Sequence, residues 1–247
     1  MATLVWITVA MVGARSLAMA LNRLIDAEID ARNPRTARRE LPAGLLGRGQ
    51  VAAFSLGSLA VFLLAVSQLA PRTWLLWPLV VVPFVVYPYL KRVTPLCHLW
   101  LGLCLGLAPV GAAVAVTDRV DAEPFLLLGV VLTWVAGFDV IYATMDLDHD
   151  RREGLHSIPA DYGIATGLLA ARVLHATSVV LMAGVGLAFE LGPAYWLGVV
   201  ACAALLAYEN AIVRPHDLSR VNAAFFNVNA VIAGLYLAAV AVDLALG

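Results

Sequence analysis

The chain has 247 residues, of which 62% are hydrophobic and only 13% are charged, and its formal net charge is −1. Together with a mean hydropathy of +0.88, this composition excludes an ordinary soluble domain and is typical of a protein that crosses the membrane several times. The three cysteines lie in or beside apolar stretches, so we expect small buried side chains there rather than a disulfide or metal framework.

Apolar stretches of about 20 residues are long enough to span a bilayer as helices. Eight candidates occur along the chain, at 4–22, 51–70, 74–90, 96–117, 124–145, 164–189, 193–212 and 221–246. The sequence therefore predicts an all-α fold in which residues 1–247 form a single domain, a polytopic transmembrane helical bundle. The first stretch lacks a basic segment before it and carries Arg15, so we do not expect a cleavable signal peptide.

Lysine and arginine residues are concentrated in every second loop. The first, third, fifth and seventh loops hold most of the lysines and arginines outside the spans, whereas the other side receives only Arg72 and Arg119. By the positive-inside rule, the odd-numbered loops are cytoplasmic and the N-terminus lies outside. We therefore expect an integral membrane protein whose odd-numbered loops face the cytoplasm; in a bacterium this is the inner membrane.

The first stretch ends in a polar motif. Asn22, Asp26 and Asp30 are spaced four residues apart, so they share one face of a helix. Arg15 lies seven residues before Asn22 on the same face and roughly in the middle of the segment. There we expect it to face a polar cavity, where its guanidinium would bind a substrate carboxylate.

An arginine-rich loop follows this motif. Arg35 and Arg39 come directly after the acidic face and are placed to reach a diphosphate, whereas a topology signal or lipid contacts explain at least Arg32 and Arg48. At the end of the third stretch, Tyr87 and Lys91 are four residues apart. Lys91 is placed to join the anion site and Tyr87 to line a pocket below it, although interfacial anchoring explains both side chains equally well.

A second copy of the pattern ends the fifth stretch, with four polar side chains on one face: Asp139, Tyr142, Asp146 and Asp150. If the two motifs face each other, four carboxylates converge, and hard cations with oxygen ligands make that charge favourable. The simplest interpretation is a magnesium site that holds a diphosphate. His149 and His156 raise the alternative of zinc, but the carboxylate-rich surroundings and the absence of thiolate or paired-histidine spacing favour a hard cation.

Both motifs continue in a recognisable way. The first is followed by Asn33-Pro34-Arg35-Thr36, Arg39, Leu41-Pro42 and Gly44, and the second by Gly154 and Ser157-Ile158-Pro159. With these residues the chain resembles the UbiA superfamily of intramembrane prenyltransferases from about Arg15 to Gly163. The pairs Arg15 and Asn22, Lys91 and Arg92, and Asp139 and Asp146 resemble the 4-hydroxybenzoate polyprenyltransferases and the related menaquinone-pathway enzymes that prenylate a naphthoate.

The resemblance implies a helical bundle with a central cavity open to the cytoplasmic side, Mg²⁺ as cofactor, and prenyl transfer in ubiquinone or menaquinone biosynthesis. The expected partners are a polyprenyl diphosphate, an aromatic acid acceptor and the lipid bilayer, with no nucleic acid. The sequence departs from the family in two ways. Arg23 stands where many relatives have Asp. Relatives usually have nine helices, so either the start lies further upstream or eight helices close the cavity.

The expected site has four parts. The metal ligands are Asn22, Asp26, Asp30, Asp146 and Asp150, and the diphosphate is bound by Arg35, Arg39 and Lys91. Neutralising the diphosphate lets the allylic C–O bond ionise. The acceptor site holds Arg15, Asp139 and Tyr142, with Asp139 accepting a hydrogen bond or proton from the acceptor's phenol. Tyr87, Tyr142 and Asn229 are candidates for the prenyl or cation pocket.

Other functions are compatible with parts of this pattern. One is a UbiA-type enzyme that acts on haem or a glycerol phosphate. Another is a cation-coupled membrane transporter, which would carry charges near the membrane midplane in broken helices, whereas these acids lie at the cytoplasmic ends of their spans. A CDP-alcohol phosphotransferase would show Asp-Gly and Ala-Arg spacing within one helix, which is absent. The sequence leaves the prenyl length, the acceptor and the oligomeric state open.

Overall fold

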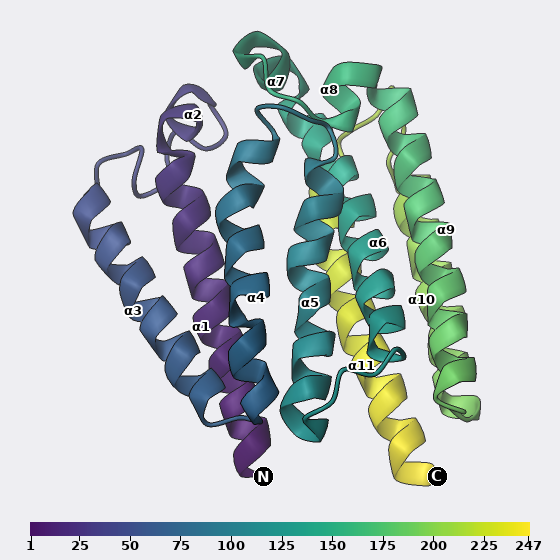
Figure 1. The fold of residues 1–247 in the computed structure, drawn as a ribbon. Helices are drawn as coiled ribbons and strands as arrows, with labels where there is room; N and C mark the ends of the chain where they lie inside the picture. The colour runs from purple at the N-terminus through teal and green to yellow at the C-terminus, as the bar shows by residue number, and fades with distance from the viewer. The chain divides into compact units, whose positions relative to one another are not determined.

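The computed structural model describes all residues, 1–247, and its regular elements are helices (Figure 1). Eight helical segments are long and apolar enough to cross a membrane, which confirms the predicted all-α fold and the number of spans. Six are single helices: α1 (Ala2–Ile25), α3 (Arg48–Ser67), α4 (Pro71–Leu90), α5 (Cys97–Thr117), α9 (Ile164–Ala188) and α10 (Pro193–Ile212). The chain is therefore an integral membrane protein.

Two spans are composite. One begins with α6 (Pro124–Ala143) and continues through the 3₁₀ turn η1 (Thr144–Asp146) into α7 (Leu147–Glu153). The last begins with the π-helical turn η2 (Ala223–Val228) and continues as α11 (Asn229–Leu246). Two further helices are short: α2 (Ala27–Arg32) carries the last residue of the first acidic motif, and α8 (Ile158–Tyr162) lies in the loop after the second.

The chain forms two compact units. Unit 1 contains Met1–Val93 and Leu107–Asp121, and unit 2 contains Thr94–Gly106 and Ala122–Gly247. The boundary between them runs through α5, whose first half belongs to unit 2 and whose second half belongs to unit 1. Each unit has its own hydrophobic core and one of the two acidic motifs.

In unit 1, α1 lies between α3 and α4 (Figure 1). Its core is formed by Ala10 of α1 and by Phe62, Ala65 and Val66 of α3. Gly13 makes this contact close, because a Cβ there would lie 2.8 Å from the backbone nitrogen of Phe62. Small residues let helix backbones approach in lipid, where no hydrophobic driving force between helices exists. This packing therefore fixes the rotation of α1 about its axis and with it the direction in which Asn22 points.

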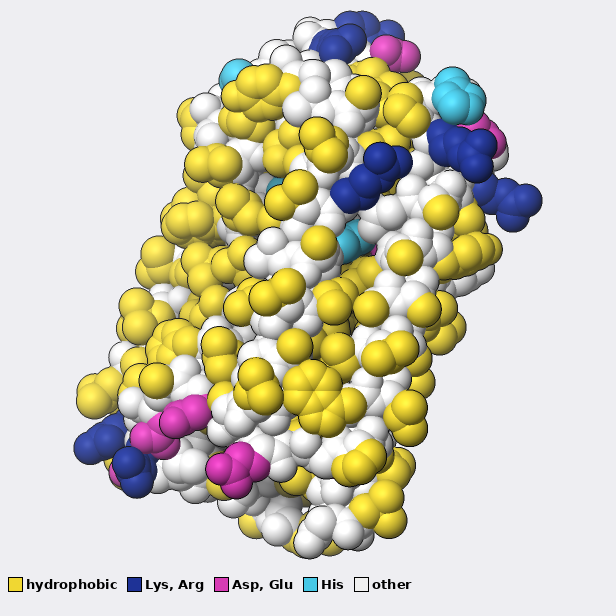
Figure 2. Space-filling model, turned by 90° about the vertical axis from the view of Figure 1, so that its right-hand side faces the viewer, with side chains coloured by type: hydrophobic (Ala, Val, Ile, Leu, Met, Phe, Trp, Pro, Cys, Tyr) yellow, Lys and Arg dark blue, Asp and Glu magenta, His cyan; other side chains and the backbone are white.

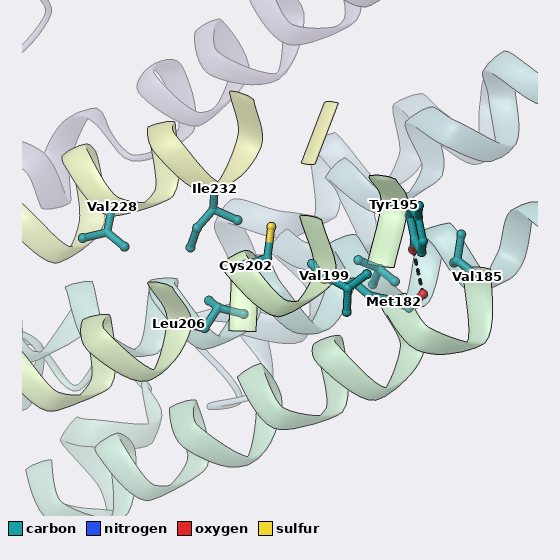
Figure 3. Packing of buried hydrophobic residues seen from close by; sticks show 9 residues of the cluster. Met182, Val185, Tyr195, Val199, Cys202, Leu206, Val228 and Ile232 are labelled. Atoms are coloured by element: carbon teal, nitrogen blue, oxygen red, sulfur yellow. Dashed lines mark hydrogen bonds between the residues drawn. The ribbon is translucent and has the colours of Figure 1, made fainter. Parts of the chain in front are cut away.

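In unit 2, α6 packs along α9, and α10 packs on α9 and α11. Figure 3 shows the largest buried cluster, to which α9, α10 and α11 contribute Met182, Tyr195 and Ile232 respectively. The Tyr195 hydroxyl donates to the Met182 carbonyl oxygen at 2.6 Å, so this deep polar group is paired. Pairing of this kind is needed where no water is available.

The surface matches a membrane environment. Figure 2 shows the side of the molecule that lies to the right in Figure 1, where hydrophobic side chains cover the middle and charged side chains gather mostly toward the two ends. Exposed apolar residues such as Leu169, Val180 and Leu197 lie on α9 and α10. In water such a surface would promote aggregation, whereas in a bilayer it faces lipid.

Candidate functional site

The first acidic motif lies in unit 1, where α1 gives way to α2. The break occurs at Asp26, with φ −91° and ψ 4°. The helical hydrogen bonds nevertheless continue across it, since Asp26 N–H donates to the Asn22 carbonyl at 3.0 Å and Asp30 N–H donates to the Asp26 carbonyl at 2.8 Å. The predicted shared face is therefore present, and the Asn22 amide donates to Asp26 Oδ2 at 3.0 Å.

Asp26 is almost completely buried, with 2% of its surface exposed. Lys91 Nζ lies 2.7 Å from its Oδ2 and Arg92 Nη2 lies 3.5 Å from its Oδ1. Burial raises the pKa of the Asp26 carboxyl, and the Lys91 ammonium opposes this shift. Lys91, for which the sequence predicted a role in binding diphosphate, therefore lies at the acidic motif, and Arg92 is a second cation at the same carboxylate.

Asp30 is the centre of a second group of contacts in unit 1. Its Oδ2 lies 2.7 Å from Arg39 Nη1 and 4.0 Å from Arg23 Nη1. The Thr36 hydroxyl donates to the Asp30 carbonyl at 2.9 Å, which folds the arginine-rich loop back over the end of α2. The fold of the loop thus places Arg39 at the acidic face, whereas the side chain of Arg35 is exposed.

The other predicted residues of unit 1 lie along the same helices. Arg15 is exposed on α1 and has no ion-pair partner within its unit. Tyr87 is half-buried near the end of α4, one turn before Lys91.

The second acidic motif, in unit 2, repeats the backbone arrangement of the first. The chain breaks at Asp146, with φ −101° and ψ 6°, between η1 and α7, and Asp150 lies in the first turn of α7. Gly154 ends α7 in the left-handed conformation, with φ 65°. The chain then turns so that the Ser157 hydroxyl donates to Asp150 Oδ2 at 3.3 Å.

Asp139 and Tyr142 lie before this break, on α6. Asp139 Oδ2 is 2.7 Å from Nδ1 of His98, at the start of α5. The ring of Tyr142 stacks on Phe225 of η2, with 4.1 Å between ring centroids and 27° between ring planes. The half-buried Tyr142 therefore belongs to a group of aromatic rings that includes Phe225 and Phe226.

Asn229 lies deeper in unit 2, at the start of α11, and is buried. Its Oδ1 accepts a hydrogen bond from Trp134 Nε1 at 2.6 Å, and its Nδ2 donates to Glu209 Oε1 at 2.9 Å. Nδ2 also lies within hydrogen-bonding distance of the Ala224 and Phe225 carbonyls of η2. The amide that the sequence suggested for a pocket is thus fully used in a network between helices.

The side chains of the two motifs suit a hard divalent cation. No three carboxylate, imidazole or thiol groups of either unit meet at one point. Each motif instead supplies two carboxylates, and Asn22 adds an amide oxygen in unit 1. Asp26 Oδ1 is buried without a hydrogen-bond donor, although Arg92 is near it. Buried carboxylate oxygens of this kind are the ligands that Mg²⁺ prefers, so the residues fit the predicted metal.

Three contacting residues were not assigned a role from the sequence: Arg92, His98 and Ser157. The Lys-Arg pair after α4 and the Ser-Ile-Pro segment after the second motif were visible signals for Arg92 and Ser157. His98 had no such signal, because its partner Asp139 is 41 residues away on another helix.

Comparisons with known proteins find relatives of this chain both by sequence and by structure. The model of the UbiA prenyltransferase family matches residues 1–231. A 4-hydroxybenzoate octaprenyltransferase of Ralstonia nicotianae is 32% identical over 204 residues, which cover 82% of this chain and 69% of that protein. The apo structure of a UbiA homologue from Aeropyrum pernix K1 superposes with a TM-score of 0.91 at 34% identity, covering 99% of this chain and 90% of that chain.

A more distant structure shares the fold. It is a UbiA homologue from Archaeoglobus fulgidus bound to GPP and Mg²⁺, with a TM-score of 0.68 and 19% identity, covering 98% of this chain and 88% of that chain.

Proposed function

This chain belongs to the UbiA prenyltransferase family, and we propose that it transfers a polyprenyl group from a prenyl diphosphate to a hydroxylated aromatic acid in quinone biosynthesis. The relative from Ralstonia nicotianae, named for 4-hydroxybenzoate, supports this acid as the acceptor for a ubiquinone pathway. A naphthoate of the menaquinone pathway is the alternative acid. The positive-inside distribution of lysine and arginine supports an active site on the cytoplasmic side, and the bacterial relative supports a bacterial inner membrane.

One observation carries the proposal: each unit presents an acidic residue at a helix break and a second acid one turn later. In unit 1 these acids, Asp26 and Asp30, are buried and already paired with the cations Lys91 and Arg39. A surface of alternating acids and bases is suited to a ligand that carries both a metal and phosphate groups. The homologue from Archaeoglobus fulgidus, bound to GPP and Mg²⁺, supports the same ligand class for this chain.

The proposed magnesium ligands are Asn22, Asp26, Asp30, Asp146 and Asp150. Magnesium bound there would supply positive charge that makes the diphosphate a better leaving group. Lys91 and Arg39 lie beside these acids and would turn their N–H groups to the diphosphate oxygens, and Arg35 would reach them from the same loop.

The reaction then needs little covalent help from the protein. The allylic C–O bond breaks and its electron pair leaves with the diphosphate, so the prenyl carbon becomes cationic. The face of Tyr142, held against Phe225, would stabilise that cation, and Tyr87 would line the path of the prenyl chain. An aromatic ring carbon of the acceptor forms the new C–C bond and loses its proton.

The acceptor would be held by charge. Arg15 is exposed and without an ion pair in its unit, so its guanidinium would bind the carboxylate of the aromatic acid. Asp139 would accept a hydrogen bond from the phenol, which raises the electron density of the attacking ring. Arg15 lies seven residues before Asn22, and Asp139 lies seven residues before Asp146, which is about 10 Å along each helix. This spacing would place the acceptor beside the allylic carbon of the substrate rather than beside its phosphates.

An activity assay with purified protein in detergent and prenyl diphosphates of several lengths identifies the acceptor. Aromatic acids (4-hydroxybenzoate and a hydroxynaphthoate) and a glycerol phosphate are offered separately, and products are identified by mass. We expect a prenylated aromatic acid that requires Mg²⁺ and disappears with EDTA. Prenylation of the glycerol phosphate alone would overturn the proposed acceptor class, and an EDTA-resistant reaction would overturn the metal assignment.

A further inference from the structure

The hydrogen bond between His98 and Asp139 brings together a buried and a half-buried polar residue from different helices. His98 is 2% exposed, and the Asp139 side chain is 19% exposed. The 2.7 Å distance from His98 Nδ1 to Asp139 Oδ2 is short for a nitrogen donor and a carboxylate. Both residues lie in unit 2.

The other ring nitrogen fixes the position of the histidine proton. The Ile158 backbone N–H, in the loop after the second acidic motif, donates to His98 Nε2 at 3.3 Å. Nε2 therefore accepts a hydrogen bond and carries no hydrogen of its own. The ring hydrogen is on Nδ1, where it is donated to Asp139.

Contacts along α5 hold the His98 imidazole in this position. Cys97, the neighbouring residue, donates its thiol to the His156 carbonyl at 3.6 Å, so the start of α5 is tied to the 156–158 loop at two points. Further along α5, Gly106 lets the helix approach α6 closely, because a Cβ there would lie 2.8 Å from the Leu128 carbonyl oxygen. His98 thus meets Asp139 from a fixed direction.

The two oxygens of the Asp139 carboxylate differ in their contacts. Oδ2 is engaged by His98, whereas Oδ1 accepts no hydrogen bond within unit 2. We infer that His98 is a positioning residue for acceptor binding: it orients Asp139 so that Oδ1 is presented to the phenol of the aromatic acid. The inference rests on the proposed function, because it assigns the phenol to Asp139.

Two substitutions separate positioning from simple burial. In His98→Asn, the amide nitrogen can occupy the place of Nδ1 and keep the donor to Asp139, while the partner of Ile158 is lost. In His98→Gln, the amide reaches the place of Nε2, and the donor to Asp139 is lost. A matched control is His175→Gln, which changes a second buried histidine of unit 2, on α9. The ring of His175 is hydrogen-bonded to Asn210, which is not a residue of the proposed site.

The experiment measures KM and kcat for both substrates and the thermal stability of each variant in detergent. We expect His98→Gln to lower kcat/KM for the aromatic acid about 10-fold to 100-fold, a range typical of residues that orient a site group, with little change in the KM of prenyl diphosphate. His98→Asn should restore most of this loss, and His175→Gln should affect stability alone. Equal losses in His98→Asn and His98→Gln, or equal losses for both substrates, would reject the positioning role.

A readout without turnover completes the test. In protein labelled with ¹⁵N-histidine, the nitrogen chemical shifts of His98 should show the tautomer with hydrogen on Nδ1, and Asp139→Asn should change them. The opposite tautomer in the wild type would reject the inference. If the wild type prenylates aromatic acids and His98→Gln does so equally well, only the role of His98 fails. If the wild type prenylates no aromatic acid, the proposed function fails and the inference fails with it.

Discussion

Asp26 and Asp146 hold the same backbone conformation, with φ and ψ of −91° and 4° at Asp26 and −101° and 6° at Asp146. Each lies at the break between a membrane-length helix and a short helix, and each is followed four residues later by another aspartate, Asp30 or Asp150. Few residues adopt this bridge region of backbone space, and active-site residues are often among them. The two units therefore present their acids in the same way.

The first prediction tests these acids. Asp26→Asn and Asp146→Asn should each abolish prenyl transfer while the protein stays folded in detergent, because each removes a charge that the proposed metal site needs. Glu28→Gln is the matched control, since Glu28 is an exposed acid of α2 that pairs with Arg48. Turnover above about a tenth of the wild-type value, a loss of only ~1.4 kcal/mol in transition-state stabilisation, would contradict the metal assignment.

Orientation in the membrane can be tested by cysteine labelling. The native cysteines, Cys97, Cys104 and Cys202, are buried and free, so they should give little background. Cysteines introduced in the loops 31–48 and 151–163 should be shielded from an impermeant thiol reagent applied outside intact cells, and one near Asp121 should be labelled. Labelling of either motif loop from outside would reverse the proposed topology.

A third prediction concerns the acceptor carboxylate. Arg15→Leu should raise the apparent KM for the aromatic acid about tenfold or more, because a charge-assisted hydrogen bond is worth ~1.5–3 kcal/mol. The KM for prenyl diphosphate should stay near that of the wild type. Arg48→Gln serves as the control, since it removes an exposed arginine of the same unit. Equal weakening of both substrates together with a lower melting temperature would assign Arg15 to folding instead.

The fourth prediction concerns the stability of unit 2. Asn229→Leu should lower the melting temperature in detergent, because it leaves the Trp134 indole N–H and Glu209 Oε1 buried without their partner. Each unsatisfied group costs about 1–3 kcal/mol. Asn227→Leu, an exposed position of the same turn, is the control and should change stability little. A melting temperature of Asn229→Leu equal to that of Asn227→Leu would refute the network's role.

The spans could be predicted closely because length and hydrophobicity decide them. The stretch 193–212 coincides with α10, and 96–117 differs from α5 by one residue. The second stretch was predicted at 51–70, whereas α3 runs from Arg48 to Ser67. The sequence criterion counts apolar residues, but the helix begins where Gly47 and Gln50 cap it with a hydrogen bond, and Pro71 already starts the next helix.

Polar local structure was harder to predict. No helix was predicted between the stretches 124–145 and 164–189, yet residues 151–163 contain the end of α7 and the short helix α8, whose N-terminus is capped by the Ser157 hydroxyl. In the site, contacts within one turn, such as Asn22 with Asp26, followed from helical spacing. Contacts between helices, such as His98 with Asp139, depend on how helices rotate against each other, which periodicity does not encode.

The π-helical turn η2 has a consequence for the register of the last span. A π turn holds one residue more than the α turn it replaces, and each residue of an α-helix advances about 100° around the axis. Every side chain after Val228 is therefore rotated by about 100° from where an uninterrupted helix would place it. Deleting one residue of η2, such as Phe226, would turn the side chains of α11 by about 100° around the helix axis, so Ile232 would leave its core cluster.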